Sequence, residues 1–142
     1  MKILRLLDLR KQQEKQARGI FSQALRCWQL EAHRLDNLRG ELVQVKDLLH
    51  KQERLQINIW QRYTKYIAKL EEMIKIQREQ VEEKREDMEK ARLDWEESRM
   101  EKEKMEVLLK KRREVQEERQ RMLGQRELDE IGRAMVLRGN RV

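Results

Sequence analysis

The residues that most often carry out catalysis or hold metal ions are few in this chain and stand far apart. The only histidines are His33 and His50, and the only cysteine is Cys27. Neither histidine has a cysteine or carboxylate at the spacing that metal ligands show. Acidic pairs such as Glu71–Glu72 are typical of solvated helix residues, and no phosphate loop or nucleophile motif accompanies them. We therefore expect no enzyme, no metal site, no cofactor and no small-molecule substrate.

Basic residues are the second chemical signal, since the net charge is +7. The run Lys110-Lys111-Arg112-Arg113 suits contacts to phosphates. Elsewhere acids interleave with bases, as in Lys84-Arg85-Glu86-Asp87, which is typical of charge pairs along an exposed helix. No purely basic segment precedes the heptads, as a zipper-type DNA reader requires. The pattern favours protein partners and no nucleic acid, with DNA binding as the alternative.

The composition indicates what kind of element carries these residues. Charged residues make up 43% of the 142-residue chain and aromatic residues 4%, with no proline and five glycines. Such a chain has too few apolar side chains for a compact globule, but it suits a long helix that buries one narrow seam. The single cysteine and the lack of an apolar run of ~20 residues indicate a cytoplasmic protein that contacts membranes only peripherally, through its partners.

An apolar stripe recurs in alternating steps of four and three residues, which is the pattern of a coiled coil. It fails in the polar stretch from His50 to Gln56, and a second stripe resumes one residue out of register. We therefore expect one coiled-coil domain over residues 1–142, with helix 1 over 2–51, a turn over 52–58 and helix 2 over 59–138. The first stripe comprises Ile3, Leu7, Arg10, Glu14, Ala17, Phe21, Ala24, Trp28, Glu31, Leu35, Leu38, Leu42, Val45, Leu49 and Gln52. The second comprises Trp60, Tyr63, Ile67, Leu70, Ile74, Gln77, Val81, Lys84, Met88, Ala91, Trp95, Ser98, Lys102, Met105 and Leu109.

The two stripes match if the chain reverses near residue 55. Leu35 then meets Ile74, and the bulky Trp95 lies beside the small Ala17, as knobs fit holes without voids. The predicted fold class is all-α: an antiparallel two-helix coiled-coil hairpin with a C-terminal single-helix overhang. One bent continuous helix and a parallel dimer of straight helices are the structural alternatives.

The overhang is expected over residues 110–142, because helix 1 runs out opposite residue 109. Apolar residues continue along it without a partner in the chain, which favours a surface for another protein; a frayed tail is the alternative. The hairpin brings two basic chain ends together, and an electropositive, partly apolar tip suits an electronegative hole. The apolar residues are Leu108, Val115, Met122, Leu123, Leu128, Ile131, Met135 and Val136.

Several strings of residues match the pattern of a known family. The start of helix 2 follows the order W..Y..YI..LE..I..Q, in Trp60, Tyr63, Tyr66, Ile67, Leu70, Glu71, Ile74 and Gln77. Further matches are Leu4, Leu7, Arg10, Glu14 and Ala17, then Trp95, the 108–113 stretch and the 125–130 stretch. Together these strings resemble the FliJ family of the bacterial flagellar type III export apparatus over nearly the whole chain. The resemblance implies an antiparallel hairpin similar to part of the γ stalk of rotary ATPases.

The resemblance also implies a function. Members of the family are non-enzymatic stalks that enter the ring of the export ATPase (FliI-like) and promote its assembly and ATP hydrolysis. They contact the export gate protein (FlhA-like) and handle export chaperones, in the cytoplasm and at the cytoplasmic face of the cell membrane. A YscO-type virulence secretion stalk and a structural coiled coil without an export role are the alternatives.

Site residues follow from the same resemblance. It maps the gate-binding surface to Tyr66, Leu70, Met73 and Gln77, which share one helix face; Leu70 belongs to the seam series as well. Joined to the charge distribution, it assigns ring binding to Arg5, Arg10, Lys110, Lys111, Arg112, Arg113, Met122, Gln125, Asp129 and Glu130.

Overall fold

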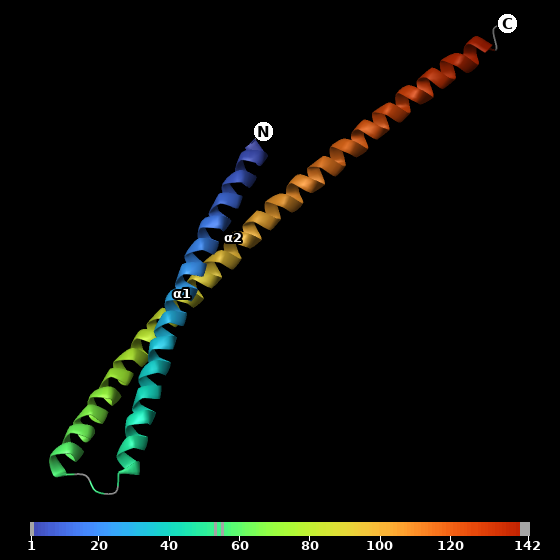
Figure 1. Cartoon of the computed structure of the whole chain (residues 1–142). Coiled ribbons are helices and arrows are strands. Elements are labelled where there is room, and N and C mark those ends of the chain that lie inside the picture. The colour runs from blue at the N-terminus through green and yellow to red at the C-terminus, as the bar shows by residue number, and fades with distance from the viewer. Residues whose placement is uncertain (1, 53, 55, 140–142) are drawn as a thin grey trace. The chain divides into compact units, whose positions relative to one another are not determined.

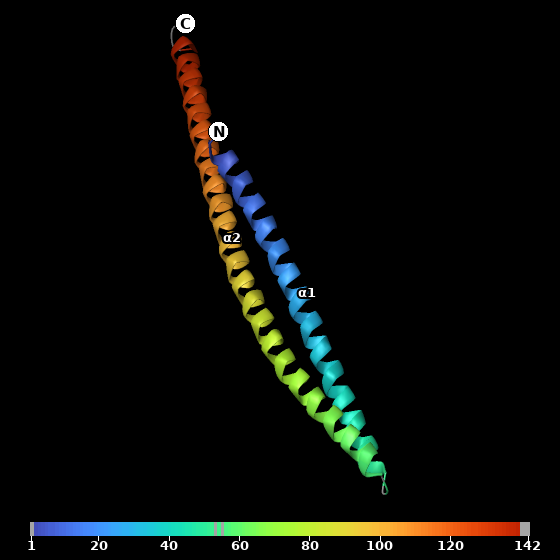
Figure 2. The ribbon, with the colours of Figure 1, turned by 90° about the vertical axis from the view of Figure 1, so that its left-hand side faces the viewer.

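The computed structural model describes residues 2–52, 54 and 56–139, which form two long helices. Helix α1 spans Lys2–Lys51 and helix α2 spans Ile57–Gly139. No strand occurs among the described residues. The two helices pack against each other and run in opposite directions (Figures 1 and 2). The predicted all-α antiparallel hairpin is therefore confirmed, and a single bent helix is excluded.

The chain reverses between Lys51 and Ile57, inside the polar stretch. Helix α2 begins at Ile57 rather than at residue 59, because the Trp60 N–H already donates to the Gln56 carbonyl oxygen at 3.0 Å. The Thr64 hydroxyl donates back to the carbonyl oxygens of Gln61 at 2.9 Å and Trp60 at 3.1 Å in the first turns. Parts of the expected domain, turn and overhang lie outside the described residues, namely Met1, Glu53, Leu55 and residues 140–142.

The packed residues group into two units, and each unit contains one segment of α1 and one segment of α2. The first unit is Gln13–Ser98, and the second combines Met1–Gln12 with Arg99–Val142. A single domain over residues 1–142 stays a prediction.

The seam of the Gln13–Ser98 unit lies along the predicted stripes. Every predicted position from Glu14 to Leu49 on α1, and from Tyr63 to Ser98 on α2, is buried or half-buried. Trp60, predicted to open the second series, is instead 51% exposed. Position 60 lies next to the reversal, where α1 ends and has few turns left to cover it. The buried residues of this unit are Glu14, Leu35, Val45, Leu70, Ile74, Met88 and Ala91.

Polar and aromatic contacts between the helices establish which residues face each other. The Trp95 indole N–H donates to Glu14 Oε1 at 3.1 Å. The Trp95 ring also stacks on Phe21, with the ring centroids 5.4 Å apart. Glu14 and Phe21 stand on either side of Ala17 along α1, so Trp95 lies at the predicted register. A buried polar pair of this kind disfavours slipped registers, because slippage would leave the carboxylate in the seam without this donor.

Charged residues outside the seam pair along each helix. Arg85 contacts Glu82 at 2.7 Å, and Arg92 contacts both Glu89 at 2.9 Å and Glu96 at 2.6 Å. These partners are three or four residues apart, as the interleaved charges of the sequence predict. Exposed ion pairs of this kind stabilise a helix only weakly, because solvent screens their charges. Helical order therefore depends on the seam more than on these pairs.

Two glycines in α1 offer a first test of the fold. A Cβ atom added at Gly19 or Gly40 would meet no heavy atom within 4 Å, and neither glycine has positive φ. We expect each glycine-to-alanine substitution to raise the free energy of unfolding by about 0.5–1 kcal/mol, since alanine restricts the unfolded chain and favours helix. Urea unfolding followed by circular dichroism measures this change. Gln29→Ala, at an exposed α1 position, is the control and should change stability less; an unchanged midpoint in both glycine variants contradicts the prediction.

Candidate functional site

Exposed protein-contact surfaces are the candidate sites of this chain. Among the described residues, no group of three His, Cys, Asp or Glu side chains is arranged to hold a metal ion. Neither helix, over its described length, has a stretch long and apolar enough to cross a membrane. Two surfaces stand out instead: the start of α2 in the Gln13–Ser98 unit, and α2 from Arg99 onward in the other unit.

The four residues predicted to bind the gate divide into two pairs. Tyr66 is 39% and Met73 43% exposed, whereas Leu70 is only 2% exposed and Gln77 is half-buried. The division follows from the seven-residue repeat. Leu70 and Gln77 occupy equivalent seam positions one repeat apart, and Tyr66 and Met73 occupy equivalent positions at the seam edge. The structure therefore leaves Tyr66 and Met73 accessible to a partner and places Leu70 in the core.

The Gln77 side chain is used within the hairpin. Its amide nitrogen donates to the Glu31 carbonyl oxygen at 3.0 Å and to Glu31 Oε2 at 2.5 Å. Glu31 also accepts a hydrogen bond from Arg34 at 3.0 Å. Such a network binds α2 to α1 and uses the Gln77 amide nitrogen within the hairpin.

Tyr66 lies at the edge between the two helices. Its hydroxyl donates a hydrogen bond to the Glu41 carboxylate of α1, and this bond raises the pKa of Tyr66 above the ordinary value for a tyrosine. Tyr66 also lines a shallow depression with Ile59, Arg62 and Tyr63. Sequence reasoning missed Ile59, Arg62 and Glu41. The seven-residue spacing of Ile59, Tyr66 and Met73 was a signal that could have found the first of them.

The basic residues predicted to bind the ring lie in the unit formed by Met1–Gln12 and Arg99–Val142. A groove between the first turn of α1 and α2 is lined by Ile3, Leu4, Leu109, Arg112, Arg113 and Gln116. Leu7, one turn after Ile3 on α1, is buried. The groove brings Arg112 and Arg113 to the first turn of α1, while Arg5, Lys110 and Lys111 are exposed and Arg10 is half-buried.

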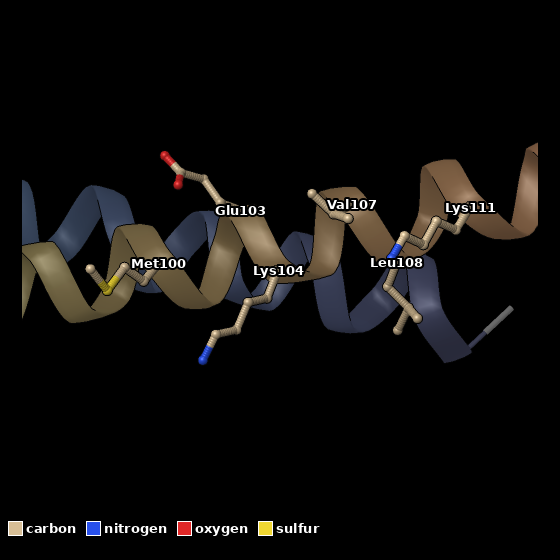
Figure 3. Close-up of a pocket in the computed structure, with 6 residues that line it drawn as sticks. All are labelled: Met100, Glu103, Lys104, Val107, Leu108 and Lys111. Carbon is tan, nitrogen blue, oxygen red and sulfur yellow. The ribbon is translucent and has the colours of Figure 1, made fainter.

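An apolar patch, of which the sequence predictions included only Leu108 and Lys111, lies on α2 of the same unit. It is lined by Met100, Glu103, Lys104, Val107, Leu108 and Lys111. Figure 3 shows these side chains on α2, with the ribbon of α1 behind it. Met100, Val107 and Leu108 are 58%, 52% and 44% exposed. The seven-residue step from Met100 to Val107 is the sequence signal for this second face.

Beyond residue 109, α2 continues as helix to Gly139 with its side chains in solvent. Described residues 110–139 are exposed throughout, apart from the half-buried Gly124. The predicted ring-binding residues here include Met122, which is 60% exposed, and Gln125, whose amide donates to Asp129 at 3.3 Å. Glu130 is exposed as well. Residues 110–139 therefore form a helix with exposed apolar side chains and not a frayed tail.

Comparison with known proteins yields one match. The model of the family described as flagellar FliJ protein matches residues 2–141. No curated protein and no solved structure matches the chain.

Proposed function

The chain belongs to the flagellar FliJ protein family, and on that premise we propose that it is the non-enzymatic stalk of the export ATPase ring. Membership makes it a component of the flagellar export apparatus. The proposal adds that residues 99–139 of α2, together with the first turns of α1, bind a FliI-like ATPase. Binding promotes assembly of the ring and ATP hydrolysis by it, as the family resemblance implies.

One observation carries this proposal: a long stretch of α2 keeps helical order while its apolar side chains remain in solvent. Val115, Met122 and Leu128 are 48%, 60% and 64% exposed. Helices in proteins gain most of their stability from packing against another surface, and exposed apolar residues at helical spacing suit insertion into a groove or ring. The basic run from Lys110 to Arg113 adds a positive charge that favours an electronegative partner and speeds encounter.

The start of α2 supports a second contact, with a FlhA-like gate protein at the cytoplasmic face of the membrane. Tyr66 and Met73 present exposed apolar surface there. Contacts with export chaperones belong to the proposal through the family resemblance alone. In this arrangement the ring and the gate use different parts of the chain, so one molecule links the two.

The test of ring binding is the ATPase rate of a purified FliI-like ATPase from the same organism, with and without this protein. We expect the protein to have no ATPase activity alone and to raise the rate of the partner. Lys110→Glu with Lys111→Glu should weaken this stimulation about tenfold or more, because it reverses two exposed charges beside the apolar patch. The weakening should shrink at high salt, which screens exposed charges.

A matched control is Lys75→Glu with Arg78→Glu, which changes the net charge equally at exposed positions of α2 in the other unit. This variant should stimulate the ATPase like the unaltered protein. Equal loss in both double variants would show a general charge effect and contradict a local ring-binding surface. An ATPase rate that stays constant on addition of the unaltered protein would refute the stalk function.

A further inference from the structure

Two contacts between the helices hold opposite edges of the first turns of α2. On one edge, the Tyr66 hydroxyl donates to Glu41. On the other, Lys46 lies 3.5 Å from Glu71. The second contact is an exposed ion pair, with side chains 47% and 55% accessible, and such pairs contribute little. The first contact differs, because it fixes an aromatic ring that is itself part of an exposed surface.

The Tyr66 ring shapes the depression that it shares with Ile59, Arg62 and Tyr63. An exposed tyrosine without a partner for its hydroxyl samples several side-chain rotamers. The hydrogen bond to Glu41 selects the rotamer that leans toward α1, so the ring is ordered before any partner arrives. Ordering a side chain in advance improves the affinity for a partner, because the side-chain conformational entropy is lost on folding and not on binding.

We propose that Glu41 is a positioning residue of the gate-binding surface, holding the Tyr66 ring in the orientation that the gate protein contacts. This inference rests on the proposed contact between the start of α2 and the gate. Glu41 itself need not touch the gate protein, since it acts through Tyr66. The surface is therefore built from both helices and is complete only in the folded hairpin.

Local charge indicates which kind of partner segment fits. The α2 residues from 57 to 70 include Arg62, Lys65 and Lys69 and no acid. The depression combines the apolar surface of Ile59 and the two tyrosines with the guanidinium of Arg62. Glu41 of α1 faces this region, and its carboxylate accepts the hydrogen bond from the Tyr66 hydroxyl. The gate-protein segment that fits this depression therefore carries an apolar side chain next to an acidic one.

The binding test uses the full chain and the purified cytoplasmic domain of the FlhA-like gate protein from the same organism. We expect Tyr66→Ala to weaken binding about tenfold or more and Glu41→Ala about fivefold, the size of one lost hydrogen bond. Glu41→Gln keeps an acceptor for the hydroxyl, so it should stay within about twofold of the unaltered protein. Asp36→Ala removes the same charge from an exposed α1 position and should leave binding unchanged.

A tyrosinate titration checks the mechanism without the gate protein. Only two tyrosines occur in the chain, so Tyr63→Phe makes the ultraviolet titration report on Tyr66 alone. The Glu41 bond raises the pKa of Tyr66, so the bond persists below the ordinary tyrosine pKa and is lost as the pH rises through the raised value. Within this background, Glu41→Ala should lower the pKa of Tyr66, and Glu41→Gln should lower it less.

The outcomes separate the two claims. If Tyr66→Ala weakens gate binding and Glu41→Ala does not, the positioning role is wrong and the gate contact stands. If the gate domain binds the unaltered protein and Tyr66→Ala equally well, the proposed gate surface is wrong. If Glu41→Gln weakens binding as much as Glu41→Ala, the carboxylate acts by its charge on the partner and not by holding Tyr66. Because Glu41 is exposed, unchanged helix content and thermal midpoint should accompany all its variants.

Discussion

Replacing Leu70 by alanine is expected to lower the free energy of unfolding by about 3 kcal/mol. Leu70 is 2% exposed, the lowest value in the described core. It lies in the seam beside Ile74, which is 7% exposed. The substitution removes apolar area from the seam and leaves a cavity that two rigid helices close only in part. Urea unfolding followed by circular dichroism measures the loss.

Two control variants distinguish packing from other causes. Leu70→Met keeps most of the volume and should cost less than about 1.5 kcal/mol. Met73→Ala alters a side chain that is 43% exposed and should change stability by no more than about 0.5 kcal/mol. A Leu70→Ala variant as stable as Met73→Ala would mean that position 70 is not part of the core.

The same variants separate stability from gate binding. Leu70 belongs both to the seam series and to the gate-binding set that the family resemblance implies, and its burial favours the first role. We therefore expect Leu70→Met to bind the gate protein like the unaltered chain. Met73→Ala should weaken binding while leaving the hairpin as stable as before.

Seam positions could be predicted from the sequence because burial in a coiled coil depends only on the repeat. Stepping by four and three from Ile3 selects Leu7, Leu35 and Val45, all of which are buried. The same repeat on α2 selects Leu70 and Ile74. The prediction failed beside the reversal: Gln52 closes the first stripe and Trp60 opens the second, but Gln52 is exposed and Trp60 is 51% exposed.

Hydrogen bonds across the seam could not be predicted in the same way. Glu14 is recognisable as a seam position, yet its contact with Trp95 depends on the register to within one residue and on the rotamers of both side chains. The bond between Tyr66 and Glu41 joins residues that lie outside both stripes. Periodicity places such residues at the edge of the seam but does not show which of them pair across the helices, and for this reason the candidate gate surface was only partly visible in the sequence.

Truncating Trp95 is expected to have the second large effect on stability, because three stabilising contributions are lost together. Trp95→Ala removes buried ring area, the stack on Phe21 and the indole N–H that reaches Glu14. Glu14 is 6% exposed, and losing a donor to a buried charged group is costly. We expect the free energy of unfolding to fall by about 3–4 kcal/mol. Thermal and urea unfolding monitored by circular dichroism measure the change.

Trp95→Phe divides that loss between the ring and its N–H. Phenylalanine can still stack on Phe21, an interaction of about 0.5–1.5 kcal/mol, but it offers no donor to Glu14. Trp95→Phe should therefore lower the free energy of unfolding by about 1.5–3 kcal/mol. The losses caused by Trp95→Phe and Glu14→Gln should not be additive in the double variant, because residues in contact couple. Trp60→Ala, at a residue 51% exposed, is the control and should cost far less. If Trp95→Phe is as stable as the unaltered chain, the bond from the indole N–H to Glu14 does not stabilise the hairpin.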